Sequence, residues 1–469
     1  MNIDVVVILG YLALMIVCGL FAMKRLSSTA DYLVADRNLP YWVYFPCLST
    51  VILGGGSTFG SASQSFQHGM SGAWITLMFG LGVVTVGLGF AGRLSRLRVF
   101  TLSEMLERRY AHGTRFLRAV VACIYAALIS VVQIVALGAV LKALLGWDLT
   151  VSILVGGFVT VAYTLVGGML AITITDLIQF VLMTIGIAIL IPFGIDAAGG
   201  MAAISAAVPP EFFTLTNISG TRLLGLFMSL YLGIMIGQDI WQRIFTARNE
   251  RVAAVGSISA GIYSIGWGAA MGVCGILAYV LLPGLESPQD ALPALVVKVM
   301  PAGLSGIVLA ALMSALMSTV SSTILASATL VTNDLLKPAL GFDEGRELAV
   351  SRWVTAGVSV CVIVLAVFVG DVFVALDTAY AYLSGRLFVP IMAALFWRKA
   401  TWQGALAAIL VGATVVTAAL LHYGSAAAEP VIFGILSSAV AMGLVSVLVG
   451  GPRADDLSAW NEVASEEVV

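Results

Sequence analysis

The stretch Leu53-Gly54-Gly55-Gly56-Ser57-Thr58 lies near the middle of an apolar run that covers residues 40–64. Each glycine costs a helix about 1 kcal/mol relative to alanine, so three in a row predict that the helix unwinds here. Backbone groups freed inside a membrane need new partners. We therefore interpret the stretch as an unwound segment whose carbonyl groups face a cavity. The alternative is close packing of two helices, which needs small residues on one face and not in a row.

A second, looser interruption lies five apolar runs later. It reads Gly233-Ile234-Met235-Ile236-Gly237 and is followed by Gln238-Asp239. Two interrupted helices in corresponding positions are typical of transporters built from inverted repeats. Five spans per repeat is an odd number, which forces the second repeat to be inverted relative to the first.

The composition excludes several classes of protein. Hydrophobic residues make up 60% of the 469 residues and charged residues only 10%, whereas soluble domains are about 45–50% apolar and about 25% charged. The formal net charge of −2 supplies no basic surface for nucleic acid. These values exclude a soluble enzyme, a disordered chain and a nucleic-acid-binding protein.

The predicted fold class is an all-α integral membrane protein, because apolar runs of about 20 residues recur along the whole chain. A membrane β-barrel would instead show alternating segments of about 10 residues. We count thirteen candidate spans, at residues 3–23, 40–64, 72–92, 117–144, 150–168, 173–197, 222–243, 253–282, 303–333, 350–370, 372–396, 403–421 and 431–450.

The distribution of basic residues predicts the orientation. Nineteen of the 23 lysine and arginine residues fall in alternate connections, such as 24–39 and 93–118, and in the C-terminal tail. The positive-inside rule then places the N-terminus outside and the C-terminus in the cytoplasm. We expect a multi-pass protein of the plasma membrane, which is the inner membrane in a bacterium with two membranes.

A candidate cation site lies in the run over residues 303–333. Ala315, Ser318 and Thr319 are spaced i, i+3 and i+4, so they share one helix face. Two hydroxyl oxygens and a freed carbonyl can ligate a small hard cation, which takes oxygen ligands. Ordinary hydrogen bonding of the hydroxyls to the preceding turn is the alternative interpretation.

Three motifs carry a resemblance to a known family. They are Asp31-Tyr32-Leu33-Val34-Ala35-Asp36-Arg37-Asn38-Leu39-Pro40, Gly167-Gly168-Met169-Leu170-Ala171-Ile172-Thr173-Ile174-Thr175-Asp176-Leu177-Ile178-Gln179, and Met317-Ser318-Thr319 with the following Asn333-Asp334-Leu335. In these motifs the chain resembles the sodium:solute symporter family over nearly its whole length.

The resemblance implies a leucine-transporter-type core of ten helices with one extra helix before it and two after it. Residues 1–39 would form the peripheral first helix and a cytoplasmic loop. Inverted repeat 1 would cover residues 40–198 and inverted repeat 2 residues 222–398. Residues 399–469 would form the two peripheral helices and the cytoplasmic tail.

The resemblance also implies a sodium site between the first and eighth core helices. Its ligands would be the carbonyls of Leu53, Gly56 and Ala315 and the hydroxyls of Ser318 and Thr319. Asp176, near the cytoplasmic exit, matches an acidic residue of the family and would receive the sodium ion as it leaves. The alternative for Asp176 is a capping or interface role at an inner helix end.

The substrate is less well defined by the sequence. Gly55 stands where the proline symporters carry an aspartate, and Gly233 where the sugar symporters carry a gating tyrosine, so neither solute is implied. We predict that the substrate-binding residues are Gly54, Gly55, Ser57, Gly233, Gln238 and Arg386.

Arg386 lies in the middle of a span, where a basic residue costs about 2.5–3.5 kcal/mol on insertion scales. One interpretation is a fork for a substrate carboxylate. A salt bridge to another helix or a snorkelled side chain is the alternative. Asp377, nine residues earlier, is about 13–14 Å away along a helix axis, so we expect no pairing between the two.

The predicted function is a secondary active symporter that couples inward sodium flow to uptake of a small organic solute, an amino acid or organic acid if Arg386 binds it. The open alternatives are proton coupling through Asp176 or Asp239, and a neutral or cationic solute such as choline. A channel lacks support, because no charged ring or repeated filter sequence is present. A membrane enzyme is not expected, because the three histidines form no metal motif. The expected partners are the solute and the lipid bilayer, with no nucleic acid and no protein.

Overall fold

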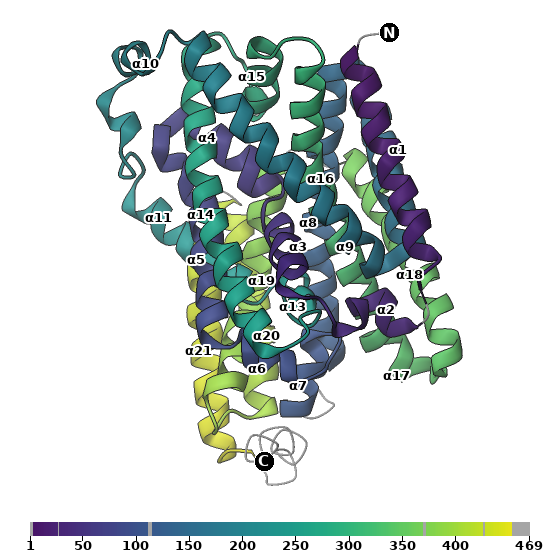
Figure 1. Cartoon of the computed structure of the whole chain (residues 1–469). Helices are drawn as coiled ribbons and strands as arrows, with labels where there is room; N and C mark the ends of the chain where they lie inside the picture. The colour runs from purple at the N-terminus through teal and green to yellow at the C-terminus, as the bar shows by residue number, and fades with distance from the viewer. Residues whose placement is uncertain (1–2, 27, 111–114, 369–371, 425–426, 453–469) are drawn as a thin grey trace.

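The computed structural model describes residues 3–26, 28–110, 115–368, 372–424 and 427–452. Nearly all of these residues are helical, and the long helices run between two ends of the molecule (Figure 1). The helices are α1 (Ile3–Met23), α2 (Thr29–Val34), α3 (Tyr41–Ile52), η2 (Gly56–Gly60), α4 (Ser61–His68), α5 (Trp74–Gly89), α6 (Ala91–Arg96), α7 (Leu102–Tyr110), α8 (Arg115–Leu145), α9 (Leu149–Ala197), α10 (Met201–Ala207), α11 (Gly220–Leu226), η6 (Phe227–Tyr231), α12 (Leu232–Ile234), α13 (Gln238–Ile244), α14 (Glu250–Leu281), α15 (Ala291–Val299), α16 (Leu304–Thr329), η8 (Leu330–Leu336), α17 (Lys337–Leu340), α18 (Glu344–Phe368), α19 (Val372–Phe396), α20 (Trp402–Tyr423) and α21 (Glu429–Val449).

Ten helical stretches of the described residues are long and apolar enough to cross a membrane, and the bent pair Gly220–Ile234 and Gln238–Ile244 makes eleven if it is one span. The expectation of thirteen spans differs because it divides two stretches further. It splits Leu149–Ala197 into two spans. It also divides Gly56–Gly89, assigning the first part to a span with α3 and the second part, α5, to a span of its own. The exact number of thirteen stays a prediction.

The long helix α9 is broken where the sequence predicted an end of a span. Gly168 has a φ of +52° inside it, a backbone conformation that only glycine adopts readily. A Cβ atom at this position would lie 2.4 Å from the Tyr32 ring and 2.6 Å from the Tyr32 carbonyl oxygen. The break therefore lets α2 approach the backbone of α9.

Three membrane stretches contain a π-helical turn, and each lies within or beside an interrupted or polar segment. The π turns are η2, η6 and η8. Such turns are rare and are found mostly at functional sites. In this protein they flank the two predicted interruptions and the end of the hydroxyl-rich helix.

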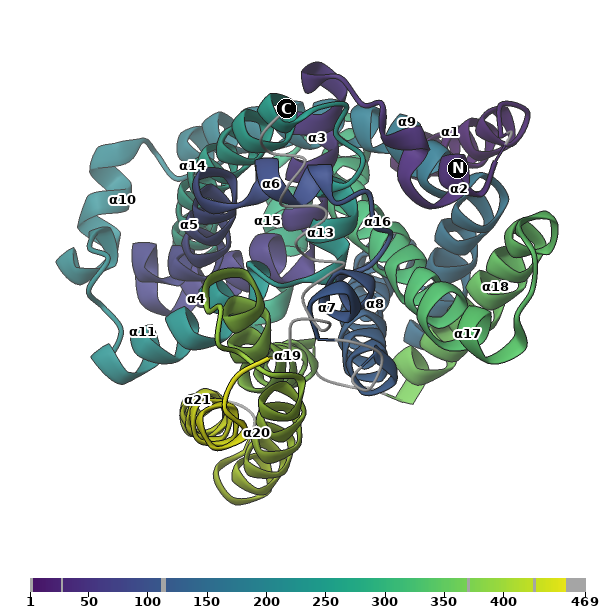
Figure 2. The same ribbon diagram turned by 90° about the horizontal axis from the view of Figure 1, so that it is seen from below.

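The centre of the molecule is formed by α16, which contacts α3, α8, α9 and α13. In the most apolar segment of Leu304–Leu340, 94% of the residues are buried inside the protein. The corresponding share is 28–39% for α1, α18, α20 and α21. The small and hydroxyl residues of α16 therefore face protein and not lipid. Figure 2 shows α20 and α21 on the outside next to α19, with α1 and α2 on the opposite side.

The connections separate into two groups at the two ends of the bundle. Figure 1 shows α2, α6, α7 and α17 at one end, and α10, α15 and the N-terminal end of α1 at the other. This grouping agrees with the alternation of basic connections in the sequence. Arg243 is an exception. It ends the predicted span 222–243 and is one of the nineteen basic residues counted in the connections, yet it lies in α13 and is fully buried.

The orientation is tested by cysteine labelling. In a background with Cys361 replaced by serine, we expect an impermeant maleimide to label Ala203→Cys in intact cells. Arg93→Cys, at the basic end, should react only after permeabilisation, because both side chains are exposed but at opposite ends. Labelling of position 93 in intact cells would reverse the predicted orientation.

Candidate ion and substrate site

The predicted interruption at the glycine triplet is present. Helix α3 ends at Ile52, Leu53 has a non-helical backbone (φ −90°, ψ 37°), and a π turn begins at Gly56. Hydroxyl groups from the next turn satisfy part of the freed backbone. Ser57 Oγ donates to the Ile52 carbonyl at 2.7 Å, and Thr58 Oγ1 donates to the Leu53 carbonyl at 2.8 Å.

The three glycines also allow three other helices to approach the break. A Cβ atom on Gly54 would lie 2.5 Å from Thr319 Oγ1 of α16, and one on Gly56 would lie 2.8 Å from Leu376 of α19. The amide N–H of Gly55 donates to Gln133 Oε1 of α8. Glycines in a row therefore serve close packing after all, because α8, α16 and α19 contact the triplet from different directions. The sequence offered no signal for Gln133 beyond its being a polar residue in an apolar run.

The hydroxyls of Ser318 and Thr319 meet the end of α3 at the break. Ser318 Oγ donates to the Thr50 carbonyl at 2.9 Å, and Thr319 Oγ1 donates to the Val51 carbonyl at 3.1 Å. Both hydroxyls also lie 3.2 Å from the Ala315 carbonyl, so the hydrogen bonding within α16 that formed the alternative interpretation is present too. Five oxygen atoms gather here.

Two of the predicted carbonyl ligands are not the ones that these hydroxyls contact. The contacts go to Thr50 and Val51, which lie before Leu53 and Gly56 in the chain. The Leu53 carbonyl accepts from Thr58 instead. Spacing along one helix predicts which residues share a face, but it does not fix which turn of the neighbouring helix lies opposite them.

Asp176 forms a buried ion pair that the sequence did not predict. Its Oδ2 accepts from Arg243 Nη2 at 2.6 Å, and the same nitrogen donates to Ser322 Oγ at 2.6 Å. The two charged side chains are 0% and 1% exposed. Ser322 lies one turn after Ser318 on α16 and donates to its carbonyl at 2.8 Å. The pair thus joins α9, α13 and α16 directly next to the oxygen cluster.

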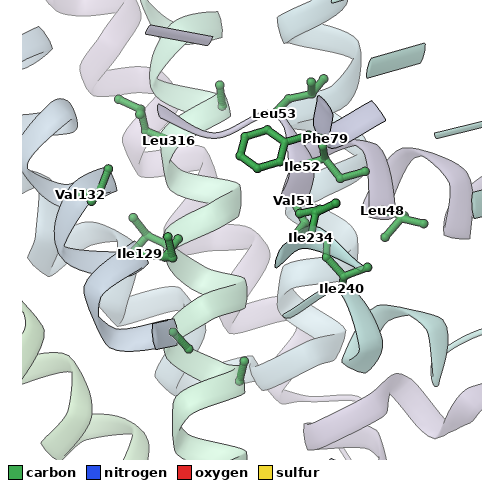
Figure 3. Close-up of a cluster of buried hydrophobic side chains, with 14 of the residues drawn as sticks. Leu48, Val51, Ile52, Leu53, Phe79, Ile129, Val132, Ile234, Ile240 and Leu316 are labelled. Atoms are coloured by element: carbon green, nitrogen blue, oxygen red, sulfur yellow. The ribbon is translucent and has the colours of Figure 1, made fainter. Parts of the chain in front are cut away.

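A small cavity lies on the other side of the break. Its lining includes Gly54, Ser57, Gln133, Asp239, Thr319 and Tyr380, and its volume is about 20 Å³, close to that of one water-sized probe. Apolar side chains from α3, α5, α8, α12 and α19 also line it, among them Val51, Ile52, Phe79 and Ile234. Figure 3 shows these four side chains within one buried apolar cluster. Gly54 and Thr319 belong both to this lining and to the contact between α3 and α16.

Gly233 and Gln238 contact other parts of the protein. A Cβ atom on Gly233 would lie 2.6 Å from Tyr380 and 2.7 Å from Ser384, so this glycine allows α12 to pack on α19. Gln238 does not line the cavity. Its Oε1 accepts from the Leu102 amide at 2.8 Å and its Nε2 donates to the Phe100 carbonyl at 3.3 Å, which anchors the start of α7.

Arg386 does not line the cavity either. Its guanidinium lies 3.7 Å from the ring centroid of Tyr382, and its Nη2 donates to Thr417 Oγ1 of α20 at 3.3 Å. The reason is that this face of α19 packs against the outer helix α20. Asp377 is paired with Arg222 at 3.8 Å, in agreement with the expectation that it would not pair with Arg386.

Comparison with known proteins places the chain in a family. The sequence profile described as "Sodium:solute symporter family" matches residues 32–412. The chain belongs to the sodium:solute symporter family. It is 28% identical over 428 residues to a high-affinity proline transporter of Bacillus subtilis, with 86% of this chain and 89% of the relative covered. It is 24% identical over 438 residues to a sodium/pantothenate symporter of Haemophilus influenzae, with 88% and 89% covered.

Solved structures show the same fold. A sodium-coupled sialic acid symporter in a substrate-bound outward-open state matches with a TM-score of 0.86 and 19% identity, over 97% of this chain and 99% of the other. A nucleobase-cation-symport-1 family transporter in a closed conformation matches with a TM-score of 0.56 and 16% identity, over 92% and 98%. These neighbours are transporters of the leucine-transporter fold. The family that the chain belongs to is a family of membrane transporters, and the apolar helices agree with a multi-pass membrane protein.

The close approach at Gly54 predicts a stability effect. Gly54→Ala should lower the free energy of unfolding by about 1–3 kcal/mol, because the new methyl group overlaps Thr319 Oγ1. Gly266→Ala is the matched control, since no atom lies within 4 Å of a Cβ there. Thermal unfolding of the purified proteins measures the difference, and equal midpoints for the two variants would contradict the close contact.

The buried ion pair makes a second prediction. Arg243→Met should cost about 3–5 kcal/mol, because it leaves Asp176 buried without a partner. Adding Asp176→Asn to this variant should recover most of the loss. The unfolding midpoints of the single and double variants test this, and a double variant no more stable than the single one would show that the pair does not account for the cost.

Proposed function

We propose that the chain is a secondary active symporter that couples inward sodium flow to uptake of a small organic solute across the plasma membrane. Membership of the sodium:solute symporter family supports this coupling. The observation that carries this proposal is that the Ser318 and Thr319 hydroxyls contact the backbone carbonyl groups at the end of α3, where the helix breaks. Oxygen atoms without a carboxylate suit a weakly held monovalent cation.

The sodium ion would lie between α3 and α16. Rotation of the Ser318 and Thr319 hydroxyl hydrogens away from the backbone would turn their lone pairs toward the ion, beside the Ala315 carbonyl. The carbonyl groups of Thr50 and Val51, which already point at these hydroxyls, are the nearest further ligands. Leu53 and Gly56 remain the ligands predicted from the sequence.

Coupling of ion and solute follows from shared residues. Thr319 contacts the end of α3 and also lines the cavity, as does Gly54. An ion that fixes the distance between α3 and α16 therefore also fixes the wall of the solute cavity. One charge crossing 100 mV supplies about 2.3 kcal/mol, and each 1.4 kcal/mol is tenfold. Each sodium ion would thus support roughly 50-fold accumulation of solute from the electrical term alone.

We also propose the finer architecture. The core would consist of two inverted repeats, residues 40–198 and 222–398, with breaks after α3 and between α12 and α13 in corresponding positions. The flanking residues 1–39 and 399–469 would be peripheral, with the N-terminus outside. Asp176 would take part in sodium exit, which requires its ion pair with Arg243 to open.

Two alternatives lose support. A carboxylate-bearing solute rested on Arg386, which contacts Tyr382 and Thr417 away from the cavity. Proton coupling through Asp176 has to compete with the Arg243 guanidinium, which already neutralises this carboxylate.

The sodium site is tested without knowledge of the solute. Ser318→Ala with Thr319→Ala should raise the sodium concentration needed for thermal stabilisation of the purified protein at least about tenfold, with potassium as the replacement ion. The reason is the loss of both hydroxyl ligands. Thr414→Ala, which removes a hydroxyl bonded only within α20, should leave the sodium requirement unchanged. An unchanged requirement in the double variant would refute the site.

A further inference from the structure

Asp239 is a buried carboxylate that the sodium site does not use. It lies at the start of α13, is 4% exposed and lines the cavity beside the break. Its Oδ1 atom makes no well-formed hydrogen bond, and no ion pair to Asp239 occurs in the part of the chain that the structure describes. The backbone amides of Asp239 and Ile240 at the start of α13 stabilise the carboxylate in part, but a buried carboxylate without a cationic partner stays costly unless a cation joins it.

The nearest positive side chain is already engaged. Arg243 stands four residues later on the same helix, but its guanidinium is bound to Asp176 and Ser322. The two carboxylates and one guanidinium of this region therefore leave one negative charge at the cavity. Of Asp176, Asp239 and Arg243, Asp239 is the residue that lines the cavity.

The free oxygen is accommodated by a glycine. Gly237 has no side chain, and a Cβ atom there would lie 2.7 Å from Asp239 Oδ1 and 3.4 Å from the Tyr125 hydroxyl. The Tyr125 hydroxyl is the polar neighbour of the carboxylate, yet it too makes no well-formed hydrogen bond. A ligand group that reaches this point would find an anionic oxygen and a hydroxyl side by side.

Aromatic rings surround the same carboxylate. Tyr380 and Phe79 line the cavity with ring centroids 5.3 Å apart, and the Tyr125 ring lies 5.4 Å from that of Tyr380 in an edge-on arrangement. A carboxylate beside aromatic faces attracts an organic ammonium group by charge and by cation–π interaction. The lining also carries oxygen atoms of Ser57, Gln133 and Thr319, so it is the aromatic rings that favour an organic cation over a bare inorganic one.

We propose that Asp239 binds the positively charged group of the transported solute, and that the solute is an organic cation with an alkylammonium group. This inference rests on the proposed sodium-coupled symport and names its substrate class. The cavity of about 20 Å³ is too small for such a solute, so the surrounding helices have to separate to admit it.

The test is a binding screen on the purified protein in saturating sodium. The probes are tetramethylammonium, choline and a primary alkylamine, each paired with a neutral isostere such as 3,3-dimethylbutan-1-ol for choline, together with carboxylates including acetate and proline. We expect thermal stabilisation by an ammonium probe and none by its neutral partner. Preference for a carboxylate or a neutral probe, or no response to any ammonium probe, overturns the proposal.

Variants then assign the cation to Asp239. Asp239→Asn should weaken binding of the responding ammonium probe by about 30-fold or more, as expected for removal of one partner of a buried charge pair. Asp377→Asn, which removes a carboxylate outside the cavity, should change nothing. Unchanged ammonium affinity in Asp239→Asn contradicts the assignment. If that variant does not fold, Phe79→Leu should weaken ammonium binding several-fold, and an unchanged affinity there is equally contradictory.

The two proposals fail in different ways. Loss of sodium stabilisation from the wild-type protein would refute the symport proposal itself. Sodium stabilisation that is normal in both the wild type and Asp239→Asn, with no ammonium binding in the wild type, would refute only the substrate class. Normal sodium affinity in Asp239→Asn also excludes a sodium ligand at this carboxylate.

Discussion

The hydrogen bonds from Ser318 and Thr319 to the end of α3 hold the centre of this transporter together. They join the most buried helix to a helix that stops in mid-membrane, where the α3 backbone can no longer satisfy its own carbonyl groups. Their partners are backbone atoms, so their geometry depends on where α3 ends and not on its side chains. Gly54 permits the approach, and Thr319 then forms part of both the oxygen cluster and the cavity wall. Removal of the break would therefore disturb the oxygen cluster and the cavity wall together.

The charges in the core are distributed in a way that suits this arrangement. Arg243 is neutralised by Asp176 on the α9 side, whereas Asp239 on the cavity side has no cationic partner among the described residues. All three side chains are buried, so the cost of each unpaired charge is high. The carboxylate without a cationic partner, Asp239, lines the cavity. The other carboxylate, Asp176, is paired with Arg243 where α9, α13 and α16 pack together.

Much of the architecture could be predicted from the sequence, because membrane helices are long apolar runs and glycines interrupt them visibly. The break at Gly54–Gly56 and the shared face of Ala315, Ser318 and Thr319 follow from local spacing. Local spacing does not show which neighbouring helix each of these residues contacts. Arg386 was assigned to the cavity by its depth in the membrane, yet its face of α19 meets α20. Gln238 was assigned by its place after the second break, yet it reaches the start of α7.

Arg243 illustrates the same limit from the other direction. It stands at the end of the predicted span 222–243 and counts among the basic residues of the connections, but the short helix α13 continues inside the protein and buries it beside Asp176. Periodicity shows where a helix is apolar. It does not show whether the end of that helix lies in water or in the core, because this depends on the neighbours that arrive from distant parts of the chain.

The three π turns have a consequence for how the chain can change in length. A π turn contains one residue more than a turn of α-helix, and each residue rotates a helix by about 100°. The turns at Gly56–Gly60, Phe227–Tyr231 and Leu330–Leu336 therefore absorb an extra residue that would otherwise rotate every later side chain away from its partners. Loss of a single residue within one of these turns converts the turn to regular α-helix. The side chains of the segment that follows then keep their directions. Among the described residues, these are positions in the membrane core where deletion of one residue is compatible with a continuous helix.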